Sequence, residues 1–270
     1  MRDQLISYLT QIPGVSQVWR RFPVGSIDVR VRHGIFDRPP YAFGVHAAAI
    51  LARQLGLSAI QTIEFGVAGG RGLLALERIA DAVQHYLNVQ VSVCGFDTGR
   101  GMPAPIDYRD LPYVWAEGFY SMDAGKLKAA LKPSTRLVLG DIKTSLGRWE
   151  PEAPVGFVAF DLDYYSSTKE ALNLFNRGND SLLPRVYSYF DDVMWPPHAL
   201  HNEWVGELCA IREFNETHQD RKLCPIHMFR YTRPRAASWN EQMYVLHDFN
   251  HPLYCSNITN PDIRYRQKPL

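Results

Sequence analysis

The 270-residue sequence contains no closely spaced pair of cysteines, and its four cysteines lie far apart, at Cys94, Cys209, Cys224 and Cys255. Zinc sites and disulfide scaffolds use clustered cysteines, so neither is expected, and free thiols are typical of a reducing cytosol. The N-terminal residues lack the apolar core of a secretory signal, and no apolar run is long enough to span a bilayer. We therefore expect a cytoplasmic protein with no membrane partner.

The chain also lacks an excess of charge of either sign, since 29 lysines and arginines stand against 28 aspartates and glutamates. Proteins that bind nucleic acids usually concentrate positive charge on one face, so no nucleic-acid partner is expected. Two short basic clusters, at 230–235 and 264–269, are interpreted as solvated or anion-contacting surface. Apolar residues make up 46% of the chain and charged residues 21%, which is typical of a globular domain.

Strand-like and helix-like segments alternate along most of the chain, which predicts parallel β-α-β units with helices on both faces of one sheet. Strands are expected at 59–66, 89–97, 135–141, 155–163 and 185–192, followed by two closing strands at 222–229 and 242–249. Helices are expected at 41–57, 72–87, 125–132, 167–175 and 203–218. The predicted fold class is therefore α/β, with a doubly wound and mostly parallel sheet.

The predicted domain organisation has three parts: an N-terminal extension at 1–40, a ligand-binding domain at 41–250 and a C-terminal tail at 251–270. The extension begins with an amphipathic pattern, and its later part, 26–36, alternates like a short strand. The sequence DRPP at 37–40 is expected to break regular structure before the first helix of the domain. The extension is also a candidate surface for a homo-oligomer.

Acidic residues follow the predicted strands at the points where the strands end: Glu64, Asp97, Asp141, Asp161, Asp163, Asp191 and Asp192. In a parallel sheet these ends share one edge, where ligands bind. Two segments, FDLD at 160–163 and FDD at 190–192, each supply a pair of aspartates. Four carboxylates that lose water at one place favour a cation or a proton-transfer role. The alternative is that they cap helices or start turns, as acids in such positions often do.

A glycine-rich turn, IEFGVAGGRGLLAL, connects the first predicted strand of the domain to a helix. The dinucleotide pattern G-x-G-x-x-G fails, because Ala68 and Arg71 stand where its second and third glycines belong. A different pattern, an acid followed by spaced glycines, fits Glu64, Gly66, Gly69, Gly70 and Gly72. Asp97, at the end of the next strand, is placed to accept hydrogen bonds from ribose hydroxyls. A structural loop, with Asp97 starting a turn, is the alternative.

Four segments in this order resemble the macrocin O-methyltransferase-like family: IEFGVAGGRGLLAL, GFDTGRGMP, FDLDYYSSTKEAL and YFDDV. This family is a metal-assisted branch of the class I methyltransferases, and the resemblance covers roughly 41–250. It implies the Rossmann-like class I methyltransferase fold and S-adenosylmethionine as the cofactor. The residues predicted to bind the cofactor are Glu64, Gly66, Gly69, Gly70, Gly72, Asp97 and Asp141, although the family frequently has an aromatic residue at the position of Asp141.

The same resemblance implies a Mg²⁺ site beside the methyl donor. Asp161 or Asp163 would bind the ion together with Asp191 and Asp192, and one aspartate of the first pair would help to take the proton from the acceptor hydroxyl. Mg²⁺ prefers oxygen ligands, and a metal-bound hydroxyl is more acidic, so the chemistry is reasonable. The implied acceptor is a small hydroxylated molecule, such as a sugar or another natural product.

Two other functions stay open on the residues alone. The DLD segment at 161–163 also resembles the DxD element with which glycosyltransferases hold the metal of a nucleotide-sugar, although the glycine-rich turn is then unexplained. A non-catalytic protein that retains the fold is the third hypothesis. His198 and His201 are candidates for a base or a substrate contact, or are loop residues without a role. Core packing is favoured for Trp195 and Trp204.

Overall fold

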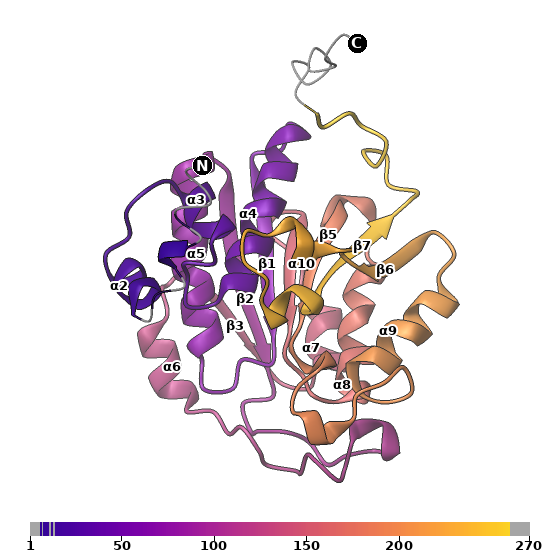
Figure 1. Ribbon diagram of the computed structural model, residues 1–270. Coiled ribbons are helices and arrows are strands. Elements are labelled where there is room, and N and C mark those ends of the chain that lie inside the picture. Colours follow the sequence, from indigo (N-terminus) through magenta and orange to yellow (C-terminus); the bar gives the residue numbers. More distant parts are fainter. Residues whose placement is uncertain (1–5, 7, 11, 13, 260–270) are drawn as a thin grey trace.

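The computed structural model describes residues 6, 8–10, 12 and 14–259, and these residues form a seven-stranded sheet (Figure 1). The strands lie in the order β3-β2-β1-β4-β5-β7-β6. Their bounds are β1 Ala59–Phe65, β2 Gln90–Asp97, β3 Arg136–Leu139, β4 Val155–Phe160, β5 Leu182–Phe190, β6 Arg221–Pro225 and β7 Met243–Asp248. β1 to β5 pair in parallel, whereas β7 is antiparallel to both β5 and β6. The predicted mostly parallel α/β sheet is therefore confirmed.

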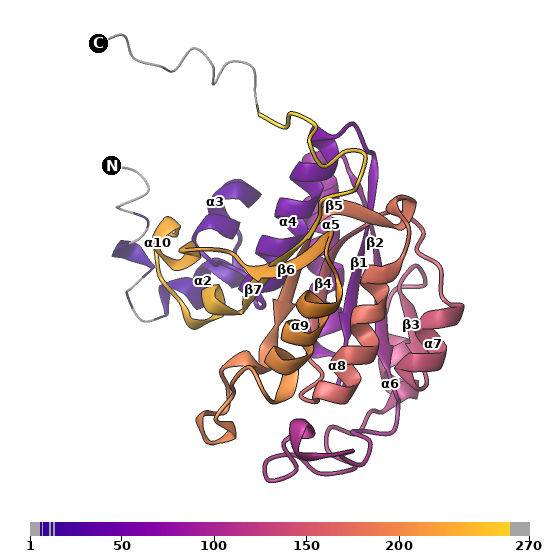
Figure 2. The ribbon, with the colours of Figure 1, turned by 90° about the vertical axis from the view of Figure 1, so that its right-hand side faces the viewer.

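Helices cover both faces of this sheet (Figure 2). The core on one face includes side chains from α3 Ile27–Arg32, α4 Pro39–Gln54, α5 Arg71–Leu87, α6 Ala124–Ala130 and α10 Phe229–Thr232. The core on the other face includes side chains from α7 Ile142–Arg148, α8 Tyr165–Ala171 and α9 Gly206–Thr217. Further helical segments among the described residues are α2 Val15–Arg21 and the short 3₁₀ helices η1 Tyr108–Asp110, η2 Leu172–Asn176, η3 Asn179–Ser181, η4 Asp191–Val193, η5 Pro197–Ala199 and η6 Ser238–Gln242.

The centre of the sheet is apolar on both faces, which explains the unbroken apolar run VGFVAF of β4. Phe157 points into the core under α4, whereas Phe160 belongs to the opposite core. The ring of Phe160 stacks on that of Phe190 at the end of β5, with 4.4 Å between ring centroids. Burial of such a side chain stabilises the fold by about 1.5–3 kcal/mol. This packing fixes the two strand ends that the acidic segments follow.

The strand predicted at 26–36 is wrong, because residues 27–32 form helix α3. The Ser26 side chain accepts a hydrogen bond from the backbone amide of Val29 and so caps the helix. Ile27 and Val31, four residues apart, are both buried and lie on one face of α3. Apolar residues at every second position fit a strand, but the cap and the i, i+4 pair favour the helix that forms.

Other predicted boundaries shift by a few residues. α4 begins at Pro39, inside the segment expected to break structure, because proline is well tolerated in the first turn of a helix. All four cysteines are free, as expected, although Cys224 and Cys255 are exposed. No helix within the described ranges is both long and apolar enough to cross a membrane.

Candidate active site

A cavity of about 840 Å³ opens at the carboxyl ends of β1, β2, β4 and β5. Its lining includes most of the acids and glycines singled out in the sequence: Glu64, Gly66, Gly69, Gly72, Asp97, Asp161, Asp163, Asp191 and Asp192. A second cavity of about 800 Å³ shares Asp97 and Leu162 with the first and extends past Asp141. The carboxyl edge of the sheet therefore gathers the predicted site residues, with Asp141 in the adjoining cavity.

The glycine-rich turn is shaped by close backbone approaches that only glycine permits. Gly66 has a φ of 84°, and a Cβ there would overlap the backbone carbonyl oxygen of Asp161. Gly70, with a φ of 81°, is the N-cap of α5. A Cβ on Gly72 would overlap the carboxyl oxygen Oε1 of Glu64. The absence of a Cβ lets the turn pack against the residue that follows β4 and against the Glu64 side chain. Residues 66–69 of the turn line the cavity.

The Asp97 carboxylate ties this turn to the end of β2. Its Oδ2 accepts hydrogen bonds from the backbone amides of Val67, at 3.0 Å, and Ala68, at 2.9 Å. Its Oδ1 accepts a 2.7 Å hydrogen bond from the amide of Gly99. Asp97 therefore starts a turn, which was the alternative to a ribose contact in the sequence analysis. A carboxylate has about four acceptor positions, so three such bonds leave room for a ribose hydroxyl.

Glu64 is buried and only half satisfied. Its Oε1 accepts a 2.7 Å hydrogen bond from the hydroxyl of Tyr41 on α4. Its Oε2 has no hydrogen-bond partner among the described residues, although Glu64 lines the cavity. Burial raises the pKa of Glu64 to about 8. An unpaired acceptor of this kind suits a donor group on a ligand. Tyr41 was not singled out in the sequence, because its role depends on a contact between α4 and β1.

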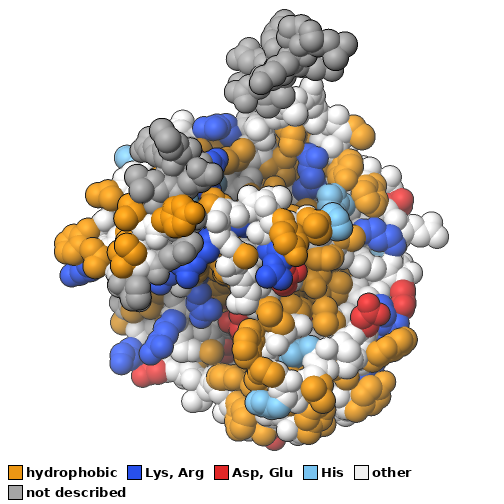
Figure 3. All heavy atoms as spheres, viewed as in Figure 1, with side chains coloured by type: hydrophobic (Ala, Val, Ile, Leu, Met, Phe, Trp, Pro, Cys, Tyr) orange, Lys and Arg blue, Asp and Glu red, His pale blue; other side chains and the backbone are white. Residues whose placement is uncertain are grey.

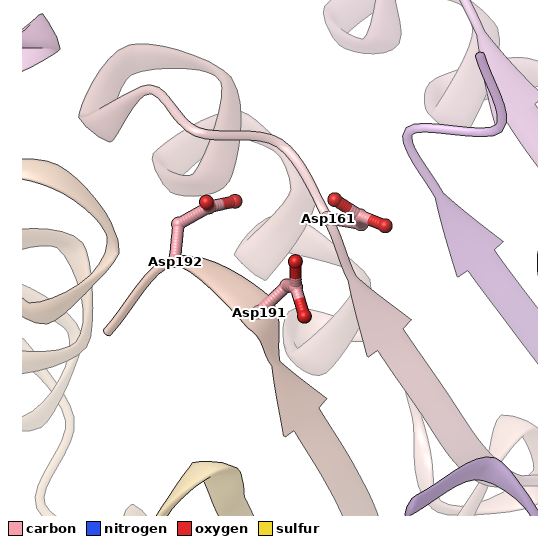
Figure 4. A group of neighbouring side chains, drawn as sticks. All are labelled: Asp161, Asp191 and Asp192. Carbon is pink, nitrogen blue, oxygen red and sulfur yellow. The ribbon is translucent and has the colours of Figure 1, made fainter. Parts of the chain in front are cut away.

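Three aspartates converge where β4 and β5 end, as Figure 4 shows. Asp161 follows β4, while Asp191 and Asp192 follow β5 in η4. One carboxylate oxygen from each of the three lies within 4.8 Å of those of the other two. Burial, then the charges of Asp191 and Glu64, hold the pKa of Asp161 well above its usual range. Such mutual repulsion of neighbouring carboxylates, of which Asp192 is buried and the other two are partly buried, would be offset by a bound cation.

Asp163 lines the same cavity but is not one of the three converging aspartates. Its backbone is left-handed, with a φ of 59°, and its amide donates a 3.0 Å hydrogen bond to Oδ2 of Asp192. Burial raises the pKa of the Asp163 carboxyl to about 7. Neither Asp161 nor Asp163 caps α8, whose N-cap is Tyr164, so helix capping does not account for them.

Two residues that the sequence analysis missed hold the aspartates in place. The Glu207 Oε2 accepts a 3.0 Å hydrogen bond from the amide of Asp192, and the Gln242 side-chain amide donates to the carbonyl oxygen of Asp191 at 2.7 Å. Glu207 is fully buried near the start of α9, on the same face as Ile211 and Phe214. An acid on that apolar face was the available sequence signal.

The fold of the chain is similar to that of a solved methyltransferase structure. The calicheamicin methyltransferase CalS11 is 21% identical, and the comparison covers 86% of this chain and 89% of that chain with a TM-score of 0.50. An O-methyltransferase from Bacillus cereus, in complex with SAH, is 11% identical over 88% of this chain and 98% of that chain, with a TM-score of 0.41. No protein-family model and no curated protein matches the chain significantly.

The fold is that of the class I methyltransferases. This confirms the fold that the sequence resemblance implied. Ligands of open α/β sheets bind outside the carboxyl ends of the strands, and here the glycine turn and the ends of β1, β2, β4 and β5 bound one cavity. The assignment of individual residues to a cofactor or a metal stays a prediction.

Two loops beyond the strand ends line the same cavity as the aspartates. The loop after β2 contributes Trp115 and Tyr120, and the loop after β5 contributes Trp195 and His198. The Tyr113 hydroxyl joins the loops by a 2.6 Å hydrogen bond to the carbonyl oxygen of Ala199. In Figure 3, hydrophobic side chains lie at the surface around the lower part of the molecule, where Figure 1 shows these loops. The surface near these loops is therefore partly apolar.

The tryptophans and histidines of the second loop differ in their surroundings. Core packing was the wrong prediction for Trp195 and Trp204, which are 53% and 62% exposed. Trp204 instead stacks against the guanidinium of Arg212, with 4.3 Å between its Cζ and the ring centroid. His201 is held within the loop by a 2.9 Å hydrogen bond between Nε2 and the Trp195 carbonyl oxygen. Of the two histidines, His198 lines the cavity.

Proposed function

We propose that this protein transfers a methyl group from S-adenosylmethionine to a hydroxyl group of a small molecule, with the assistance of Mg²⁺. The observation that carries the proposal is the shared cavity: the glycine-rich turn and the three converging aspartates open into one space. A methyl donor bound by the turn would therefore lie beside an acceptor bound near the aspartates. Holding the two in line lowers the entropic part of the barrier.

The cofactor would be held by Glu64, Asp97 and the turn at 66–72. The unpaired Oε2 of Glu64 suits the ammonium group of the methionine part, and Asp97 suits a ribose hydroxyl. The adjoining cavity that reaches Asp141 offers room for the adenine. When bound, S-adenosylmethionine supplies an electrophilic methyl group on a sulfonium.

The metal would be held by Asp161, Asp191 and Asp192. These three side chains offer only oxygen atoms, which are the ligands that Mg²⁺ prefers. Their fit to a cation also follows from the raised pKa values of Asp161 and Asp192, because positive charge would relieve the repulsion that accompanies burial. When bound there, Mg²⁺ would make an acceptor hydroxyl more acidic.

Asp163 is the residue we assign as the proton acceptor. It lines the cavity next to the metal-binding aspartates, and its pKa of about 7 lies near neutral pH, which suits a general base. The Asp163 carboxylate would accept the proton of the acceptor hydroxyl, whose oxygen would take the methyl group from the sulfonium. The products would be the methyl ether, S-adenosylhomocysteine and protonated Asp163. Asp161, the other aspartate of the FDLD segment, would then serve as a metal ligand.

The proposal is tested by calorimetric titration with S-adenosylhomocysteine, with and without Mg²⁺, followed by methyl transfer to a panel of sugars, phenols and polyketides. Micromolar binding and a product heavier by one methylene group are expected. Binding of a uridine nucleotide-sugar in place of S-adenosylhomocysteine would point to a glycosyltransferase. Cofactor binding without metal affinity or turnover would point to a non-catalytic protein.

A further inference from the structure

Arg38 stands immediately before α4, and its side chain lines the larger cavity. Its guanidinium carbon lies 5.6 Å from the centroid of the Tyr41 ring. Within the part of the chain that the structure describes, the guanidinium makes no hydrogen bond and no ion pair. A partly buried cation without a partner is costly, so a ligand that supplies one would be favoured.

The charges around Arg38 show what kind of ligand this is. Burial alone would lower the pKa of Arg38, but its neighbours Tyr41, Asp161 and Glu64 raise it overall. Six acidic side chains line the same cavity: Glu64, Asp97, Asp161, Asp163, Asp191 and Asp192. Any carboxylate group that enters would be repelled by them. Two arginines, Arg38 and Arg71, line this cavity, and Arg38 is the one whose pKa responds to Glu64 and whose guanidinium lies near Tyr41. A ligand carboxylate next to Glu64 can therefore be stabilised by Arg38.

Among the described residues, Arg38 offers hydrogen-bond donors without a partner, and Glu64 offers an acceptor oxygen without a partner. Tyr41 connects them, because its hydroxyl donates to Oε1 of Glu64 while its ring lies against Arg38. Glu64 leaves Oε2 free for a donor, and Arg38 leaves its guanidinium free for an acceptor. An ammonium group and a carboxylate on the same carbon atom match this arrangement, and that combination is an α-amino acid.

We propose that Arg38 binds the α-carboxylate of the methionine part of S-adenosylmethionine, while Glu64 takes its ammonium group. The inference rests on the proposed function, since it concerns the same cofactor. A guanidinium can hold a carboxylate through two parallel N–H donors, which a lysine cannot do. Arg38 thereby makes the protein select cofactors that retain the carboxylate.

The test compares two ligands by calorimetry: S-adenosylhomocysteine and its decarboxylated analogue, S-adenosyl-3-thiopropylamine. The variants are Arg38→Gln and Arg38→Lys, and the control is Arg53→Gln, which removes the same charge from an exposed position near the far end of α4. For Arg38→Gln, S-adenosylhomocysteine binding should weaken between about 10-fold and 100-fold, while binding of the analogue changes by less than about 3-fold. Arg38→Lys should be intermediate, and Arg53→Gln should bind both ligands like the wild type.

Three results would overturn the inference. Unchanged S-adenosylhomocysteine affinity in Arg38→Gln would reject it while leaving the proposed function intact, and would assign Arg38 to the acceptor. Equal losses for both ligands would show that Arg38 acts on the shape of the cavity and does not contact the carboxylate. Failure of the wild type to bind S-adenosylhomocysteine would reject the proposed function itself. If Arg38→Gln does not fold, the same ligand comparison on Arg38→Lys decides.

Discussion

The hydroxyl of Tyr41, on α4, donates a 2.7 Å hydrogen bond to Glu64, at the end of β1. Both side chains are buried, and Glu64 has a pKa of about 8 because burial disfavours its charged form. The bond opposes that shift, since it favours the carboxylate. α4 covers the sheet, and through Tyr41 it also lowers the pKa of an acid that lines the cavity.

Glu64 should make the ligand-free protein less stable as pH rises. In the unfolded chain this carboxyl ionises near pH 4.5, whereas in the folded protein it keeps its proton until about pH 8. The unfolded state therefore binds fewer protons over this window, and the free energy of unfolding falls by roughly 3–5 kcal/mol from this group alone. Denaturation of the wild type and Glu64→Gln at several pH values measures the contribution. Equal pH slopes for the two proteins would contradict it.

Gly72 should tolerate alanine poorly. A Cβ there overlaps Oε1 of Glu64, so the buried acid must move, and overpacking of this kind costs about 1–3 kcal/mol of unfolding free energy. Gly69 is the matched control for stability, because a Cβ on it meets no atom within 4 Å among the described residues. Chemical denaturation of Gly72→Ala and Gly69→Ala measures both effects. The account fails here if Gly69→Ala loses as much stability as Gly72→Ala.

Asp191→Asn should make the metal-free protein more stable and should weaken its stabilisation by Mg²⁺. In the metal-free protein we expect the free energy of unfolding to rise by roughly 1–2 kcal/mol, because the charge of Asp191 disfavours ionisation of Asp161 and Asp192 and the variant removes that charge. Mg²⁺ at about 100 times its Kd should stabilise the wild type by about 2.7 kcal/mol and the variant by much less. Asp180→Asn, an exposed change of the same charge, is the control. Full Mg²⁺ stabilisation of Asp191→Asn would exclude Asp191 as a ligand.

Glu207 should act by positioning Asp192. The pKa of Glu207 is held well above its usual range, chiefly by burial, which favours its neutral form and makes glutamine a close substitute. Glu207→Ala leaves the buried amide of Asp192 without its acceptor, which costs about 1–3 kcal/mol of stability and should weaken Mg²⁺ binding. Glu207→Gln should restore both quantities in denaturation and calorimetry. Equal defects in both variants would show that the charge of Glu207 matters instead.

The sequence was most informative where one local pattern determines one element. The buried run of β4 and the glycines at 66–72 predicted a strand, a turn and the side of the sheet on which ligands bind. The segment 26–36 misled because Ile27, Val29 and Val31 fit a two-residue period. Its helix depends on the Ser26 cap and on packing of Ile27 and Val31 against the rest of the fold.

The supporting residues of the site could not be predicted in the same way. The bond from Tyr41 to Glu64 and the bond from Asp192 to Glu207 each join elements far apart in sequence. The partner of a buried acid is set by how helices pack on the sheet, which no local pattern encodes. The sequence therefore predicted the acids at the strand ends, but not the side chains that hold them.

The most direct test is a crystal structure of the protein with S-adenosylhomocysteine and Mn²⁺, which takes the same oxygen ligands as Mg²⁺ and is visible by anomalous scattering. We predict one anomalous peak coordinated by Asp161, Asp191 and Asp192, with the homocysteine part of the ligand against the turn at 66–72. A peak elsewhere, or none at saturating Mn²⁺, would contradict the metal site. A ligand outside the cavity would contradict the methyltransferase assignment.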